Sequence, residues 1–184
     1  MQQNEQIFVE KVKRKDVDAQ RAIYMVYAGR LLAISIRYVG SRGVAEDILH
    51  DSFIKIFKSI DRFKYRGEGS LRAWMERITI NTALEWLRSQ KRDIVLDETY
   101  IPANSESEPS PSDIQSISQE QLLLFVKELP DGYRTVFNLF CIEGYSHREI
   151  AKELGINEKS SSSQLLRAKK LLASRIKTYL EKHG

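Results

Sequence analysis

Acidic and histidine side chains occur at three places in this 184-residue sequence where their spacing invites a test for catalysis. Asp47 and His50 have the spacing of half a di-iron carboxylate site, but such a site needs a second pair and two further glutamates, and the chain offers no second copy. His147 begins a His-Arg-Glu run without the partner histidine of a zinc protease. The Gly-Glu-Gly run at 67–69 follows no predicted strand, which argues against a phosphate-binding loop. We therefore expect no catalytic residue, no metal site, no cofactor and no enzymatic activity.

A different chemistry, hydrogen bonding to nucleic acid, is suggested by the four consecutive serines at 160–163. Serine runs usually mark loops. Here leucines at helical spacing and several basic residues follow, so the serines are predicted to begin a basic amphipathic helix. Serine hydroxyls can bond base edges, and Gln164 can bond adenine through two contacts. Arg167 can reach a guanine or a phosphate, whereas Lys169 and Lys170 suit phosphates.

The residues before this helix have the outline of a helix-turn-helix. Ser146 followed by Glu149 fits a capping box, which predicts that a short helix begins at His147. Gly155 is predicted to end that helix, and Asn157 or a nearby serine to cap the next one. In a helix-turn-helix the second helix inserts its first turns into the DNA major groove. Other helical hairpins share this outline, so DNA binding is the favoured interpretation and not the only one.

Two helices are predicted in the first part of the chain, over 17–38 and 44–63, with a glycine-containing turn at 40–43 between them. The second helix has one apolar stripe, typical of a core face: Leu49, Phe53, Ile56, Phe57 and Ile60. Another face mixes charges of both signs with one aliphatic residue: Asp47, His50, Asp51, Ile54, Lys55 and Lys58. This face is either a solvated surface or a docking surface for another protein.

The segment 63–70 is predicted to be a loop, because Gly67 and Gly69 loosen the backbone. Ser70 is placed to cap a helix that runs from residue 71 to 92. Three residues are expected to belong to the core of this helix: Leu71, Trp74 and Ile78. Three polar residues fall close to one other face: Arg77, Asn81 and Arg88.

An acidic segment, 93–118, separates two basic parts of the chain. It holds six of the 25 acidic residues and none of the 29 basic ones, together with three of the four prolines. Its polar composition and length predict a flexible linker. The sequence therefore predicts an all-α fold with two small helical domains, 1–92 and 119–184, joined by this linker. Basic bodies of this kind suggest a polyanionic partner such as nucleic acid.

The apolar content and the cysteine count of the sequence bear on the cellular location of the protein. We find no stretch near the roughly 20 apolar residues that a membrane span needs, and the first residues lack the apolar centre of a signal peptide. We expect a cytoplasmic protein without membrane insertion. The single cysteine, Cys141, excludes an internal disulfide and a zinc knuckle, and is expected to be a small buried side chain.

In combination, these segments resemble the extracytoplasmic-function (ECF) sigma factors of bacterial RNA polymerase. AEDILHDSFIKIFKSI is similar to the helix by which region 2 of the family binds the clamp of core polymerase. GSLRAWMERITINTALEWLRSQKR resembles the next segment, which melts and reads the minus-ten element. The second domain resembles region 4, which binds the minus-thirty-five element and the polymerase flap. The resemblance implies promoter-specific transcription initiation, with core polymerase, promoter DNA and an anti-sigma factor as partners.

The resemblance also implies roles for individual residues. It assigns core polymerase binding to Asp47, His50, Asp51, Phe53, Ile54, Lys55 and Lys58. It assigns minus-ten binding, including capture of a flipped base, to Phe63, Lys64, Tyr65, Arg66, Ser70, Arg77, Asn81 and Arg88. It assigns minus-thirty-five binding to Arg148, Ser160, Ser162, Ser163, Gln164, Arg167 and Lys170. The chain departs from the family pattern at His50, Ser161, Ser162 and Gln164.

A stand-alone helix-turn-helix regulator is the alternative function. It would explain residues 119–184, but it leaves the mixed-charge face and the glycine-containing loop of the first domain without a role.

Overall fold

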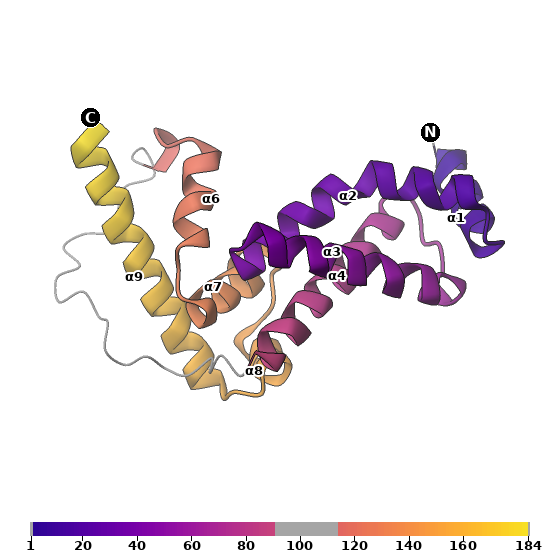
Figure 1. The fold of residues 1–184 in the computed structure, drawn as a ribbon. Coiled ribbons are helices and arrows are strands. Elements are labelled where there is room, and N and C mark those ends of the chain that lie inside the picture. The colour runs from indigo at the N-terminus through magenta and orange to yellow at the C-terminus, as the bar shows by residue number, and fades with distance from the viewer. Residues whose placement is uncertain (1, 91–113, 184) are drawn as a thin grey trace. The chain divides into compact units, whose positions relative to one another are not determined.

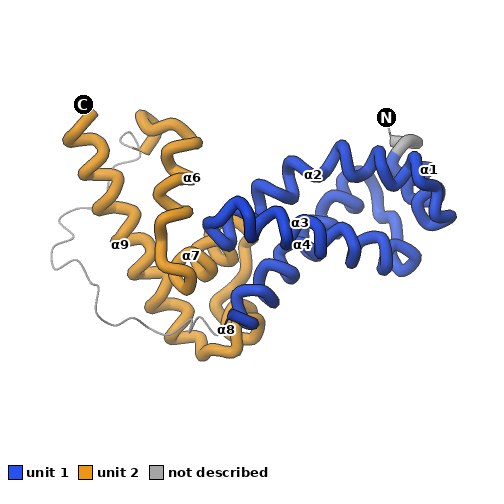
Figure 2. Tube along the Cα trace, in the orientation of Figure 1, with its two compact units in different colours: residues 1–90 blue, residues 91–184 orange. Residues whose placement is uncertain are grey.

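The computed structural model describes residues 2–90 and 114–183, and within these residues every regular element is helical (Figure 1). The chain divides into two compact units, residues 1–90 and 91–184 (Figure 2). The prediction of an all-α fold is confirmed.

The first unit is built around three long helices that pack on one another. Its elements are α1 (Gln2–Lys13), α2 (Val17–Val39), α3 (Arg42–Ser59), the 3₁₀ turn η1 (Ile60–Arg62) and α4 (Ser70–Ser89). The shorter helix α1 packs against α2 and η1. The shared core includes Val9, Leu31, Ile56, Leu71 and Met75, each at most 2% exposed.

Local signals place the ends of α2 close to the predicted bounds. The Asp16 carboxylate accepts a hydrogen bond from the Ala19 amide at 3.0 Å, which caps the helix. Gly40 ends it with a φ of 71°, a conformation that glycine adopts without strain. The helix predicted over 44–63 divides into α3 and the tighter turn η1.

By length and composition alone, α2 could cross a membrane, contrary to our expectation that no stretch approaches this limit. The core helix of a water-soluble domain meets the same criteria. In this unit α2 packs against α3 and α4, and Ile23, Leu31 and Tyr38 are buried.

The second unit is organised by one long helix, α9, which contacts the shorter helices α6, α7 and α8. Its elements are α6 (Gln119–Lys127), α7 (Asp131–Phe137), the π-helical turn η2 (Asn138–Ile142), α8 (His147–Leu154) and α9 (Glu158–His183). Two apolar clusters hold α9: one contains Leu129, Tyr133, Ala168 and Leu171, and the other Ile117, Phe125 and Ile176.

Two residues of the second unit, Ile117 and Cys141, differ in burial from what the sequence predicted. Most of the predicted linker lies outside the described residues, but Ile117, near its end, is 5% exposed and packs in the second unit. Cys141 is exposed, contrary to the burial expected for it. It lies in the π-helical turn η2, whose buried residues are Asn138 and Leu139.

Candidate nucleic-acid interface

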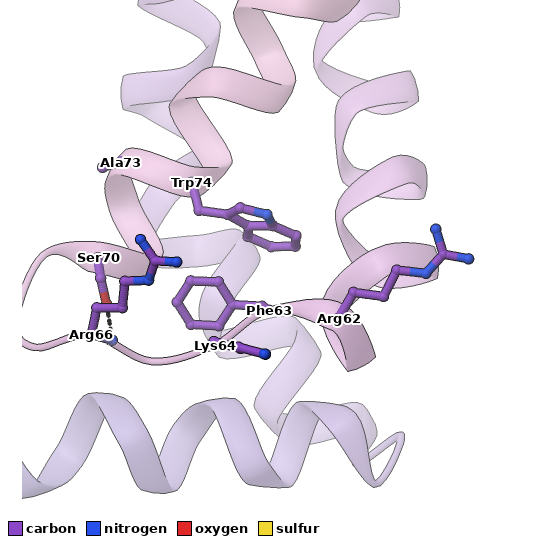
Figure 3. A pocket seen from close by; sticks show the side chains of 7 residues that line it. All are labelled: Arg62, Phe63, Lys64, Arg66, Ser70, Ala73 and Trp74. Atoms are coloured by element: carbon purple, nitrogen blue, oxygen red, sulfur yellow. Dashed lines mark hydrogen bonds between the residues drawn. The ribbon is translucent and has the colours of Figure 1, made fainter.

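A cavity of about 450 Å³ opens between the η1–α4 loop and the first turns of α4 (Figure 3). It is lined by Arg62, Phe63, Lys64, Arg66, Ser70, Ala73 and Trp74. The rings of Phe63 and Trp74 lie side by side with centroids 5.0 Å apart and planes tilted by 42°. Arg66 approaches this pair from one side, and Arg62 extends on the opposite side. Aromatic faces bordered by cations are suited to bind an unstacked base together with its phosphates.

The loop that forms this cavity has a defined backbone. Gly67 and Gly69 have φ values of 114° and 80°, in the region that side-chain-bearing residues rarely adopt. The Ser70 hydroxyl donates to the Gly67 carbonyl at 2.6 Å and accepts from the Arg66 amide at 3.2 Å. Ser70 is therefore not the cap that we predicted. The helix α4 begins at Ser70 itself, with Gly69 at the capping position, and the serine closes the loop instead.

The cavity lining contains four of the eight residues predicted to bind the minus-ten element: Phe63, Lys64, Arg66 and Ser70. Phe63 is 5% exposed and belongs to the core of the unit, so it supports Trp74 and does not present its own ring to a base, contrary to its predicted role. Tyr65 is half-buried and packs against the core of the unit, away from the lining. Three further residues lie along α4 beyond the cavity lining: Arg77, Asn81 and Arg88. Arg77 and Arg88 are exposed and Asn81 is half-buried, so this stretch of the helix offers a second polar surface outside the cavity.

Sequence reasoning missed three residues of the cavity: Arg62, Ala73 and Trp74. Trp74 was expected to belong to the core, yet it is only half-buried and its ring forms part of the lining. Arg62 precedes the predicted loop by one position. The run Arg-Phe-Lys-Tyr-Arg at 62–66, in which cations and aromatics alternate, was the signal that would have included it.

The mixed-charge face of α3 is presented to solvent as expected. Asp47, His50, Asp51, Ile54 and Lys58 are exposed. Lys55 is half-buried, and its ammonium donates to the Glu85 carboxylate of α4.

Phe53 does not belong to this exposed face, contrary to the role that the resemblance implied. It is 4% exposed and is part of the core. Its ring lies 4.7 Å from that of Tyr24, which is 44% exposed, so Phe53 supports an aromatic side chain of α2 beside the α3 face. Tyr24 thus adds an exposed aromatic side chain next to α3. Two further apolar residues of α2 are exposed, Met25 and Val26.

The helix-turn-helix outline in the second unit is confirmed at each local signal. The Ser146 amide donates to the Glu149 carboxylate at 2.9 Å, and the Glu149 amide donates to the Ser146 hydroxyl at 3.3 Å, which completes the capping box. Gly155 ends α8 with a φ of 68°. Asn157 caps α9, since its side-chain oxygen accepts from the Ser160 amide at 2.7 Å.

Along α9, the residues predicted to bind the minus-thirty-five element differ in exposure. Ser162 is exposed, as is Arg148 of α8, and four others are half-buried: Ser160, Ser163, Arg167 and Lys170. Ser161 is fully buried, and its hydroxyl lies 2.9 Å from the His147 ring nitrogen, which ties α9 to α8.

Gln164 departs from the prediction. Its side chain is 1% exposed and lies inside the second unit, so it is not presented to a base edge. Neither its amide nitrogen nor its amide oxygen has a hydrogen-bond partner within the described residues. The three-residue spacing from the buried Ser161 places Gln164 on the inner side of the helix, where Leu165 and Ala168 are also buried.

Comparisons with known proteins agree with these features. The family profile of sigma-70 region 2 matches residues 23–93, and that of sigma-70 region 4 matches residues 119–172. The ECF RNA polymerase sigma-E factor of Haemophilus influenzae is 29% identical over 185 residues, covering 95% of this chain and 96% of that protein. The protein of the same name from Salmonella typhi is 26% identical over 191 residues, covering 98% of each chain.

A solved structure of the sigma factor RpoE in complex with the anti-sigma factor NepR, from Bartonella quintana, is similar in fold. Its TM-score is 0.50 at 20% sequence identity, covering 85% of this chain and 96% of that one. The two sigma-70 regions occur in the family's order, and the relatives match along almost their whole length. The chain therefore belongs to the ECF sigma factors of bacterial RNA polymerase.

Proposed function

We propose that this sigma factor directs promoter-specific initiation by capturing one base of the melted minus-ten element in the cavity beside Trp74. The observation that carries this proposal is the lining itself, in which the half-buried Trp74 ring, packed on the buried Phe63, shares the cavity with Arg62, Lys64 and Arg66. A flipped base can stack on a ring face while the cations neutralise the flanking phosphates. Arg77, Asn81 and Arg88 continue the same binding surface along α4.

Core polymerase docks on the α3 face in this proposal. The face offers exposed carboxylates, at Asp47 and Asp51, next to exposed cations and the apolar side chain of Ile54. Charged groups at the rim of an interface give specificity and speed of association, and apolar groups give affinity. Tyr24 of α2, whose ring contacts Phe53 of α3, adds an exposed aromatic side chain to this surface.

The second unit supplies the upstream contacts. Helix α9 enters the major groove with its first turns, where Ser160, Ser162 and Ser163 reach base edges or phosphates. Arg148, Arg167 and Lys170 bind phosphates. Because Gln164 is buried, we do not assign it a direct contact with adenine.

The same unit has an apolar cavity of about 420 Å³ between α6, α7 and α9 that can receive a segment of the polymerase flap. Its lining is mostly aliphatic and aromatic and includes Leu122, Phe125, Phe137, Leu172 and Ile176. This cavity lies on a different part of α9 from the serines that we assign to DNA.

Three further properties follow from membership of the family and from the names of the similar proteins. An anti-sigma factor is a partner of the related RpoE chain, and we propose one for this chain as well. We also propose that the protein acts in the cytoplasm, where its polymerase and promoters are. Its own role is in binding and promoter opening, while polymerase performs the chemistry.

The decisive test is reconstitution with bacterial core polymerase. The purified chain should co-elute with core polymerase and give discrete run-off transcripts from a pool of genomic fragments. Asp51→Arg should abolish co-elution, whereas Glu10→Arg, a charge reversal on an exposed residue of α1, should not. Sequence-selective DNA binding without any co-elution would instead identify a stand-alone regulator.

A further inference from the structure

The loop that forms the minus-ten cavity leads into a helix that has no cap of its own. The first N–H groups of an α-helix lack partners within the helix, and a side chain at the capping position usually accepts one of them. In α4 the capping position is Gly69, which has no side chain. The Ser70 hydroxyl is already engaged with Gly67 and Arg66.

The acceptor for the first amides of α4 comes from α1, which is far from α4 in the sequence. One carboxylate oxygen of Glu5, in α1, accepts from the Gly69 amide at 3.0 Å, and the other accepts from the Leu71 amide at 3.0 Å. These contacts connect residues 64 and 66 positions apart in the sequence. A negative charge at a helix N-terminus is also favoured by the helix dipole.

Helix α1 is in turn fixed to the body of the unit. Val9 and Val12 are at most 1% exposed and belong to its core. The Glu5 carboxylate and Arg72 of α4 both lie close enough to the Tyr27 phenol of α2 to act on it electrostatically. Burial raises the pKa of the Tyr27 phenol, the nearby Glu5 charge raises it further, and Arg72 opposes this.

The capped turn includes one residue of the cavity wall, Ser70. Gly69 and Leu71 flank Ser70, which lines the cavity and holds Arg66 through its backbone amide. The Ala73 amide, one position before Trp74, donates to the Gly69 carbonyl at 3.0 Å. A shift of the Gly69 backbone would therefore displace lining residues on both sides of the turn.

We propose that Glu5 is a positioning residue for base recognition, through which α1 fixes the loop and the first turn of α4 in the geometry that discriminates the captured base. This inference rests on the proposed function of the cavity. It assigns to α1 a role in promoter selectivity without any contact between α1 and DNA.

The test compares Glu5→Ala and Glu5→Gln with Glu10→Ala, in the full chain bound to core polymerase. Glu10 is a matched control because it lies on the same helix, is exposed, and pairs with Lys13 at the surface. The probe is a single-stranded DNA oligonucleotide with the non-template sequence of a promoter found by run-off transcription, in which each minus-ten base is replaced in turn. Hydrogen exchange at the Gly69 and Leu71 amides is measured on the same variants.

For Glu5→Ala we expect exchange at both amides to accelerate about tenfold or more, because a charged acceptor is lost. Discrimination between the preferred base and its replacements should fall by about tenfold at one minus-ten position, with co-elution with polymerase unchanged. Glu5→Gln, which keeps one carbonyl acceptor, should give an intermediate loss. Glu10→Ala should change neither quantity.

Faster exchange with unchanged base discrimination would overturn the proposal and leave Glu5 a purely structural cap. If Glu5→Ala does not fold, the comparison of Glu5→Gln with Glu10→Ala decides in the same way. The double variant Lys64→Ala, Arg66→Ala separates the two proposals. If it binds the oligonucleotide as tightly as the unaltered chain, the cavity assignment fails and the Glu5 proposal fails with it.

Discussion

Gln164 is a polar residue whose side chain is buried in the second unit. A buried amide without hydrogen-bond partners costs free energy of folding, about 1–3 kcal/mol for each unsatisfied group. In the second unit both amide atoms of Gln164 are in this state within the described residues. The residue was predicted from sequence to read adenine, because its type suits that contact and its face on the helix was not considered.

We predict that Gln164→Met stabilises the second unit by about 1 kcal/mol or more, since methionine fills a similar volume without a polar group to satisfy. Hydrogen exchange of the amides in α9 measures this local stability. Gln119→Met, at an exposed position of α6, is the control and should change it little. A loss of stability in Gln164→Met would show that the amide has a partner, and would return Gln164 to the candidates for DNA contact.

Cys141 allows a prediction about pH. Although the residue is exposed, partial burial of its thiol raises the pKa above the ordinary value, and the nearby Lys169 ammonium lowers it by a smaller amount. Because the thiolate is the reactive form, a raised pKa means less thiolate at any pH below it. Alkylation by iodoacetamide should therefore be slower than for a free cysteine at neutral pH, and should accelerate as pH rises through the raised pKa.

Lys169→Gln tests the direction of the second effect. It removes the cation that lowers the thiol pKa, so the pH profile of alkylation should move to higher pH and the rate at a fixed pH near 8 should fall. Lys11→Gln, in the first unit, should leave the profile where it was. A shift to lower pH in Lys169→Gln would show that the lysine does not act on the thiol through its charge.

At the scale of the elements, we expect the stability of the second unit and its DNA recognition to depend on different serines of the helix-turn-helix. The Ser146 hydroxyl caps α8, whereas Ser162 is exposed on α9. Ser146→Ala should destabilise the second unit by about 1 kcal/mol, the usual cost of a lost cap. Ser162→Ala should leave stability almost unchanged and lower the preference for minus-thirty-five DNA over unrelated DNA.

The two variants are each other's control, measured by hydrogen exchange in α8 and by competition binding with duplex DNA. If Ser162→Ala leaves promoter preference unchanged, then the exposed serine is not a base contact and the recognition surface lies elsewhere on α9.

The same helices show which parts of the structure could be predicted from the sequence. The start and end of α8 and the start of α9 were predicted because Ser146, Gly155 and Asn157 act on neighbours a few residues away, and such local contacts leave a local pattern. The cap of α4 was predicted wrongly. Its acceptor, Glu5, comes from a distant helix, and no spacing rule within one segment can indicate a contact of that kind.

Part of the cavity lining was not predicted from the sequence, for a related reason. Hydrophobic periodicity indicates which side of a helix is apolar, but it does not distinguish a core position from the wall of a binding site. Trp74 suits both, and only the structure, in which its side chain is half-buried and lines the cavity, distinguishes them.

At the scale of the whole molecule, the charge distribution predicts how binding responds to salt. The acidic segment 93–118 contains no lysine or arginine, so the cations of the chain are all in the two flanking parts. Each phosphate neutralised by a protein cation releases counterions, which gives a slope of about −0.9 per contact for duplex DNA and about −0.7 for single strands, in log affinity against log salt concentration. If the units divide the promoter between them, each form of DNA should depend on the cations of one unit only.

We therefore predict that Arg167→Gln together with Lys170→Gln reduces the slope for duplex minus-thirty-five DNA by about 2 and leaves the slope for minus-ten single strands unchanged. Lys64→Gln together with Arg66→Gln should reduce the single-strand slope by about 1.4 and leave the duplex slope unchanged. Fluorescence anisotropy of the full chain at several salt concentrations measures both slopes, and each double variant is the control for the other. A change of both slopes by either variant would mean that the two forms of DNA share a binding surface, and would contradict the assignment of separate promoter elements to the two units.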